Sequence, residues 1–119
     1  MVPEQDMSPT CSEKDHPPGN TQAPNISAEA YAQAAAIFRA LGDVNRLRIV
    51  TMLGRQEMCV SEITSVLNDN ISAVSQRLKL LRFERIVRTR REGKHIYYRL
   101  ADAHIKALID NALEHATEI

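Results

Sequence analysis

The sequence predicts a mainly α-helical domain with one β-hairpin, on three observations. Apolar residues recur at helical spacing from Ser27 to Phe83 and again after Asp102. Between Val87 and Leu100 the pattern changes to alternation around a glycine. The two helical segments that precede this stretch are separated by only three polar residues. Together these features predict a winged helix-turn-helix fold.

The first 24 residues contain all five prolines. We therefore expect residues 1–25 to form a flexible N-terminal arm and residues 26–119 to form one small domain. The chain has no run of 18 apolar residues and does not begin with a basic-then-apolar signal, so we expect a cytoplasmic protein without membrane contact. Its two cysteines, Cys11 and Cys59, are too few for a disulfide scaffold and indicate reduced thiols or thiolate ligands.

Two helices at the start of the domain are delimited by capping residues. Ser27 is expected to be the N-cap of the first helix, which ends at Gly42. Asp43 can cap the second helix, which extends to Gly54. The apolar face of the first helix consists of Tyr31, Ala34, Ala35, Phe38 and Leu41.

The helix-turn-helix follows as a short helix over 60–67, a turn at 68–70 and a helix over 71–83. In the second helix the spacing predicts that Val74, Leu78 and Leu81 are buried. Strands over 87–91 and 95–100 then flank a turn that contains a glycine, which predicts a β-hairpin. A basic hairpin in this position is a wing.

Positive charge is concentrated in the helix and hairpin. Lys and Arg number 15 and balance 15 Asp and Glu, yet nine basic and only two acidic residues fall between positions 77 and 99. Such segregation indicates a polyanionic partner, although an inert solvated face is the alternative. With the predicted fold it indicates double-stranded DNA. The predicted contacts are Ser72, Ser75, Gln76, Arg77, Lys79 and Arg82 on the helix, and Arg88, Arg90, Arg91, Lys94 and His95 on the hairpin.

The last helix carries four potential metal ligands. Asp102 and His104 stand near its start, and His115 and Glu118 near its end. The two histidines are 11 residues apart, so they share a helix face but lie about 16 Å apart along the axis. Zinc bonds to nitrogen are about 2 Å long, so one chain cannot close a site with both histidines. The alternative is that these polar side chains are simply solvated.

Two antiparallel copies of this helix could close such a site. The start of one helix would then meet the end of the other, which gives two four-ligand sites by two-fold symmetry. The apolar stripe of the helix would build the seam between the copies. This stripe consists of Ile105, Leu108, Ile109, Ala112, Leu113 and Ala116.

Several motifs resemble those of the ArsR/SmtB family of metal-responsive repressors, and most closely its zinc sensors of the SmtB and ZiaR type. They are Asp43-Val-Asn-Arg-Leu-Arg-Ile, Glu57-Met-Cys-Val-Ser-Glu-Ile63, Ser72-Ala-Val-Ser75, Gly93-Lys-His-Ile-Tyr-Tyr98 and the terminal Asp-x-His-x10-His-x2-Glu. The resemblance implies a homodimer paired through its N- and C-terminal helices. It implies binding to palindromic operator DNA without metal, and release on binding Zn(II), which derepresses metal efflux or sequestration genes.

The resemblance implies two further features. Relatives combine the positions of Cys59 and Glu62 with ligands from the N-terminal arm, here Cys11 and His16, in a second metal site. Two thiolates and an imidazole form a softer donor set, which would accept Cd(II), Pb(II) or Cu(I) as well as zinc. Alternatively, Cys59 is a small buried apolar residue. The second feature is an allosteric relay, in which the His115 ring donates a hydrogen bond to a backbone carbonyl near Arg85.

A thiol-redox repressor and an enzyme are the alternatives to the metal sensor. A repressor that responds to thiol oxidation would use a disulfide between Cys11 and Cys59. An enzyme is not expected, because the chain lacks a His-Glu-x-x-His motif, a glycine-rich phosphate loop and a Ser/His/Asp grouping. A site filled by four protein ligands also leaves no position open for a substrate water.

Overall fold

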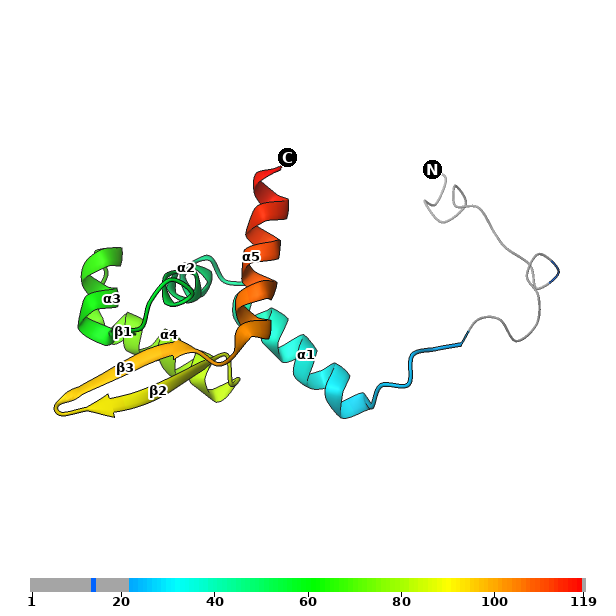
Figure 1. The fold of residues 1–119 in the computed structure, drawn as a ribbon, viewed down its shortest axis with the longest axis horizontal. Helices are drawn as coiled ribbons and strands as arrows, with labels where there is room; N and C mark the ends of the chain where they lie inside the picture. The colour runs from blue at the N-terminus through cyan, green and yellow to red at the C-terminus, as the bar shows by residue number, and fades with distance from the viewer. Residues whose placement is uncertain (1–13, 15–21, 119) are drawn as a thin grey trace, which may run out of the picture.

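The computed structural model describes Lys14 and residues 22–118. The predicted arm over residues 1–25 thus lies mostly outside the described residues, and the predicted domain boundary stays a prediction. Five helices and three short strands make up the described part of the chain (Figure 1). In order, they are α1 (Ala28–Leu41), α2 (Val44–Leu53), β1 (Met58–Cys59), α3 (Val60–Leu67), α4 (Ile71–Phe83), β2 (Val87–Glu92), β3 (His95–Leu100) and α5 (Ala103–Thr117).

The predicted helices and hairpin are confirmed. Ser27 caps α1 by accepting a hydrogen bond from the Ala30 N–H, and Asp43 caps α2 in the same way at the Arg46 N–H. The hairpin strands β2 and β3 pair from Val87 opposite Leu100 to Glu92 opposite His95. No described helix has the length and apolar character that a membrane span requires.

The sequence did not predict the third strand of the sheet. Met58 and Cys59 form β1, which pairs antiparallel with β3 so that Cys59 lies opposite Tyr97. The strand order is β1-β3-β2. Because side chains alternate across a strand, Cys59 and Tyr97 share the outer face of the sheet, while Met58 and Tyr98 face the core.

The core lies between the helix-turn-helix and the inner face of the sheet. The predicted burial of Val74, Leu78 and Leu81 is confirmed, since all three are fully buried. They meet side chains from α2, α3 and the start of the hairpin. The largest fully buried side chains are Ile49, Ile63, Leu78, Leu81, Ile86, Val50 and Val74. This core fixes α4 against the wing.

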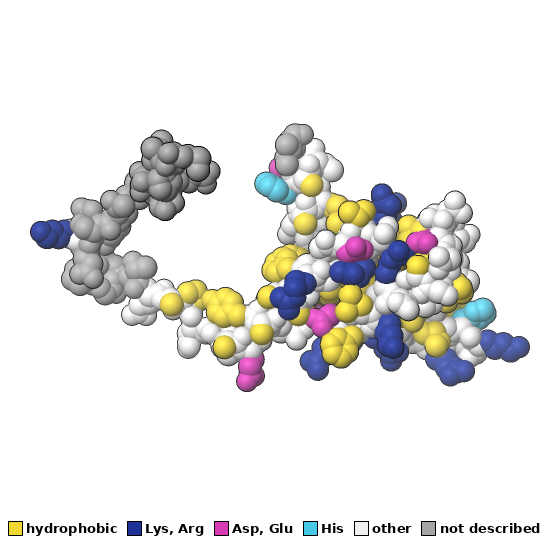
Figure 2. Space-filling model, turned by 180° about the vertical axis from the view of Figure 1, so that it is seen from behind, with side chains coloured by type: hydrophobic (Ala, Val, Ile, Leu, Met, Phe, Trp, Pro, Cys, Tyr) yellow, Lys and Arg dark blue, Asp and Glu magenta, His cyan; other side chains and the backbone are white. Residues whose placement is uncertain are grey.

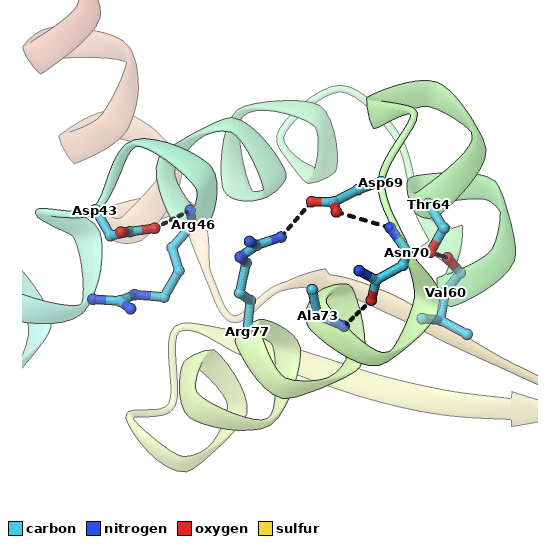
Figure 3. Close-up of polar contacts among 8 residues, drawn as sticks. All are labelled: Asp43, Arg46, Val60, Thr64, Asp69, Asn70, Ala73 and Arg77. Atoms are coloured by element: carbon cyan, nitrogen blue, oxygen red, sulfur yellow. Dashed lines mark hydrogen bonds and ion pairs between the residues drawn. The ribbon is translucent and has the colours of Figure 1, made fainter.

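The turn between α3 and α4 is held by side-chain hydrogen bonds (Figure 3). Asn68 adopts a left-handed conformation with φ 51°, which asparagine tolerates better than most residues. Asn70 caps α4 by accepting a hydrogen bond of 2.8 Å from the Ala73 N–H. Asp69 accepts hydrogen bonds from the Asn70 N–H and from Arg77. The turn therefore fixes the direction in which α4 leaves α3.

Helix α1 projects away from the rest of the molecule (Figure 1). Its C-terminal end is anchored, where Ala40 and Leu41 are buried, Ile37 packs partly against the core and the Arg46 guanidinium donates to the Ala40 carbonyl at 2.7 Å. Its apolar face is otherwise open, because Tyr31 is 53% exposed and Phe38 is 61% exposed. An apolar helix face of this kind is normally covered by another surface.

Helix α5 packs part of its predicted apolar stripe on the core of its own chain. Ile105 and Ile109 are buried in the core of their own chain, and Leu108 and Leu113 pack partly against it. Only Ala112 and Ala116 of the stripe are exposed. The spacing predicted a buried face correctly, and Ile105 and Ile109 bury it in the chain's own core. The predicted seam with a second copy stays a prediction.

Candidate nucleic-acid interface and metal-ligand residues

The helix-turn-helix presents one polar face of α4 to solvent. Ser72, Ser75 and Gln76 are exposed in its first half, and Lys79 and Arg82 are exposed further on, as the spacing predicted. The opposite face is held in the core by Val74 and Leu78. Small and amide side chains at the start of such a helix, followed by cations, suit a major groove and the phosphates beside it.

The tip of the wing is basic and exposed. Gly93 has φ 61°, a left-handed conformation that glycine adopts at little cost, and this allows the tight turn between β2 and β3. Arg91, Lys94 and His95 are exposed around it. The Arg91 Nε donates to the Gly93 carbonyl oxygen at 3.3 Å. These three predicted contacts therefore stand together at the end of the hairpin.

Arg77 forms a partly buried ion pair with Asp69. Its Nη1 lies 2.6 Å from Asp69 Oδ2, and the two side chains are only 23% and 30% exposed. The hydrogen bond from Arg77 is the main cause that lowers the pKa of Asp69 below its usual value. Arg77 thus ties the turn to α4, a role that the sequence analysis did not assign to it.

Arg90 is held in a second ion-pair network on the outer face of the sheet. Its guanidinium lies 2.6 Å from Glu57 and 2.7 Å from Glu92, and it stacks 4.7 Å above the Tyr97 ring. The hydrogen bond from Arg90 is the main cause that lowers the pKa of Glu57. Two carboxylates thus offset the charge of Arg90, whereas Arg91 and Lys94 at the wing tip form no ion pair with a described residue.

Asp102 and His104 lie together at the start of α5. Asp102 caps the helix, because its Oδ1 accepts a 3.0 Å hydrogen bond from the Ile105 N–H, and this bond is the main cause that lowers its pKa. The His104 Nδ1 lies 3.8 Å from the same oxygen, and the His104 side chain is 98% exposed. A carboxylate and an imidazole are thus close together and accessible.

His115 and Glu118 lie at the other end of α5. Both are exposed, and they are one turn apart at the C-terminus of the helix. Nowhere in the described part of the chain do three or more His, Cys, Asp or Glu side chains converge as a metal site would require. The four predicted ligands therefore form two separate pairs within one chain.

Cys59 and Glu62 meet at the start of α3. The Cys59 N–H donates to Glu62 Oε1 at 2.9 Å, and this bond is the main cause that lowers the pKa of Glu62. The Cys59 thiol is buried and lies 3.2 Å from the Ser61 hydroxyl. Both residues predicted to come from the arm, Cys11 and His16, lie outside the described residues.

The end of α4 is connected to the start of α5 by a short path. Arg85 follows α4 in a left-handed conformation with φ 61°, and the next residue, Ile86, accepts a 2.9 Å hydrogen bond from the Ala101 N–H. Ala101 immediately precedes the predicted ligand Asp102. Arg85 and Asp102 also line the same hollow. A displacement of the start of α5 would therefore reach the end of α4 directly.

Together, α3, α4 and the basic hairpin form a winged helix-turn-helix, the architecture of a DNA-binding protein. The chain belongs to the arsR family of bacterial regulatory proteins, whose family model matches residues 43–89, from the Asp43 cap into β2. It is therefore a transcriptional regulator and not an enzyme.

Similar proteins agree with this assignment. The chain is 40% identical to a transcriptional repressor SmtB homolog of Synechocystis over 93 residues, which are 78% of this chain and 70% of the relative. It is 31% identical to a cadmium resistance regulatory protein CadC homolog of Staphylococcus aureus, over 84% of each chain. A homodimeric winged helix-turn-helix domain from Mycobacterium bovis superposes with a TM-score of 0.74 at 28% identity, over 82% of this chain and 91% of that one.

Proposed function

We propose that the protein is a metal-sensing transcriptional repressor. In this proposal the protein is a cytoplasmic homodimer that binds palindromic operator DNA without metal. It releases the DNA on binding Zn(II), which derepresses genes for metal efflux or sequestration. The observation that carries the proposal is the distribution of ligand residues on α5. Asp102 with His104, and His115 with Glu118, form two exposed pairs at opposite ends of one helix.

The chemistry of the four side chains fits zinc. Two imidazole nitrogens and two carboxylates make a four-ligand set of the kind that holds Zn(II) in closed sites. A 15-residue helix is about 22 Å long, so the two pairs cannot meet within one chain. Antiparallel pairing with a second copy would bring Asp102 and His104 of one chain to the His115 and Glu118 of the other. Zn(II) would then bridge the two subunits.

The exposed surfaces of α1 and α5 support a dimer of this kind. At about 100° per residue, His104, Ala107, Asn111 and His115 lie within about 80° of one another on α5, beside its buried face. All four are exposed in one chain, as are Tyr31 and Phe38 on α1. These two surfaces are available for a second copy without disturbing the core. The names of relatives support the same assembly, since the M. bovis domain is described as homodimeric.

The path from α5 to α4 supports the proposed release mechanism. Asp102 follows Ala101, whose N–H donates to the carbonyl of Ile86, three residues after the end of α4. Ligand binding that fixes the start of α5 can therefore fix the orientation of α4 as well. Release requires that metal bind better to the form that fits DNA poorly, and a coupling of about 1–3 kcal/mol suffices.

We further propose that His115 relays the metal signal. Its ring has two nitrogens, so one can hold metal while the other donates to a backbone carbonyl. Arg85 and Asp102 line one hollow, so a His115 ring brought to Asp102 from a second copy would arrive near the Arg85 carbonyl. This argument favours a relay between subunits over one within a single chain.

Replacing His115 tests the proposal. We expect His115→Ala to keep operator binding but to lose release by zinc, because α4, the wing and the core are unchanged. The measurement is the fluorescence anisotropy of a labelled palindromic duplex during Zn(II) titration. Asp110→Ala, an exposed substitution on the same helix but outside this surface, is the matched control and should respond like the wild type. Release of His115→Ala by stoichiometric zinc would exclude this residue from the relay.

A second, softer site is proposed at Cys59 and Glu62 with Cys11 and His16 of the arm. This site would accept Cd(II), Pb(II) or Cu(I) as well as zinc. The Cys59–Glu62 contact at the start of α3 supports half of this site. Serine substitution of both cysteines separates the possibilities. Loss of the Cd(II) response alone supports the second site, whereas loss of a response to oxidant would support a thiol-redox repressor.

A further inference from the structure

We propose that a cluster of four arginines at the base of the wing binds phosphate groups of the DNA backbone. This arginine hollow is formed by Arg82, Arg85, Arg88 and Arg99. It adds Arg85 and Arg99 to the predicted DNA contacts and unites them with Arg82 and Arg88 in one site. The inference rests on the DNA-binding part of the proposed function and concerns the protein without metal, because the proposed metal site also uses Asp102 at this hollow.

Three elements bring the arginines together. Arg82 lies in the last turn of α4 and Arg85 follows it, whereas Arg88 and Arg99 come from β2 and β3. They surround an open hollow of about 740 Å³, whose other lining residues are Val87, Thr89, Ala101 and Asp102. Asp102 is the one carboxylate that lines it among the described residues. A space of this size is large enough for backbone phosphates.

The charges in the hollow are less offset by carboxylates than those of Arg77 and Arg90. Arg77 and Arg90 form ion pairs with carboxylates, but none of the four hollow arginines forms one with a described residue. Arg88 and Arg99 also lie directly opposite each other across the two strands. Like charges in that position destabilise a sheet. An arrangement that costs stability while collecting positive charge indicates an anionic ligand.

The hollow continues the face that α4 presents to DNA. Arg82 is seven residues after Ser75, so the two side chains lie within about 20° of each other around the helix. Several Lys and Arg side chains lie along the lower edge of the molecule in Figure 2, and others lie higher on the same face. The planar guanidinium can hold a phosphate through two parallel hydrogen bonds. The hollow would thus bind the backbone next to the bases that α4 reads, without sequence preference.

The test measures how DNA affinity depends on salt. Each phosphate contact contributes about 0.9 to the slope of log K against log salt concentration. The double substitution Arg88→Gln with Arg99→Gln removes two arginines from each protomer. For a dimer we therefore expect a slope shallower by about 3 to 4, with metal-free full-length protein. The slope should decrease by the same amount on a palindromic operator and on a random duplex of the same length.

A matched control carries the same change of charge elsewhere. Arg48→Gln with Arg55→Gln removes two exposed arginines that do not line the hollow, and should leave the slope much closer to that of the wild type. Arg85→Gly is a second, independent variant. Glycine suits the left-handed φ of 61° there, so the charge is removed without a penalty to folding, and the slope should again fall.

An unchanged slope in both hollow variants would overturn the proposal. If the slope is unchanged but inorganic phosphate stabilises the wild type and no longer stabilises the variants, the hollow is a site for free anions. With weaker dimerisation of the metal-free variants instead, an unchanged slope would indicate that the α5 of a second copy, rather than DNA, occupies the hollow before metal binds. Failure of the metal-sensing proposal is a separate outcome, because every slope is measured without metal.

Discussion

The winged body and the two terminal helices differ in how complete each is within one chain. In the body, α4 is held by fully buried side chains, by the Asn70 cap and by the Asp69–Arg77 ion pair. Helix α1, by contrast, leaves Phe38 and much of its apolar face exposed. Helix α5 splits its potential metal ligands between its two ends.

This difference separates the two tasks of the molecule. A surface that reads DNA has to be rigid before DNA binds. One chain supplies all the contacts that hold α4 in place. In the proposed function, the surface that senses metal has to change, and its set of ligands is complete only when a second copy is present. The predictions below test this division between the self-sufficient body and the incomplete terminal helices.

The largest effect is expected in the core of the body. Leu78 is fully buried, so Leu78→Ala should lower the free energy of unfolding by about 2–5 kcal/mol through lost burial and a residual cavity. Urea denaturation monitored by circular dichroism measures it. The control is Leu80→Ala on the same helix, where the side chain is 39% exposed and the expected cost is much smaller. Equal costs for the two would show that α4 is not anchored as described.

A smaller effect on stability but a specific one on assembly is expected at α1. Phe38 is 61% exposed in one chain, and its burial in a dimer would contribute about 1–2 kcal/mol per copy. Phe38→Ala should therefore raise the dimer dissociation constant by about 30- to 1000-fold. Sedimentation equilibrium measures this change. Phe83→Ala, at a phenylalanine that is 79% exposed on α4, should leave assembly unchanged. A dimer that tolerates Phe38→Ala would remove α1 from the interface.

The smallest effect on the fold, with a clear effect on sensing, is expected at Asp102. Asparagine caps helices about as well as aspartate, so Asp102→Asn should leave thermal unfolding at neutral pH unchanged. It should weaken Zn(II) binding at least about tenfold, because a carboxylate ligand is lost. Competition with a chromophoric chelator measures the affinity. Zinc affinity equal to that of the wild type would exclude Asp102 as a ligand.

The same variant gives a dependence on pH. The folded structure lowers the pKa of Asp102, so its carboxylate contributes stability above the ordinary value of 3.8 and loses it as the pH falls through the lowered value. The wild type should therefore lose more stability on acidification than Asp102→Asn does. Parallel acid titrations of the two proteins would contradict the role of the carboxylate as a cap.

The sequence predicted the helices and the hairpin because local chemistry specifies them. Ser27 and Asp43 supply caps, and Gly93 supplies the left-handed turn. The two-residue strand β1 was missed, because a segment that short has no periodicity and its pairing with β3 is non-local. The Arg90–Glu57 ion pair was missed for the same reason, since its partners are 33 residues apart.

The candidate site could be predicted only in part. Spacing placed His104 and His115 on one face of α5 but could not say which surface the neighbouring apolar stripe would cover. Periodicity identifies a face that is buried, not the partner that buries it, and Ile105 and Ile109 pack within their own chain. The arginine hollow draws on α4, β2 and β3, so only the folded structure could reveal it.

The most direct test of the central claim is complementation between two defective chains. One chain carries Asp102→Ala with His104→Ala, and the other carries His115→Ala with Glu118→Ala. Neither should bind Zn(II) tightly alone, since each homodimer contains only incomplete sites. After mixing and exchange, the heterodimer should regain one tight site, formed by the intact pairs of the two chains. Zinc binding measured by calorimetry should recover to one ion per heterodimer, whereas no recovery in a verified heterodimer would contradict a site shared between subunits.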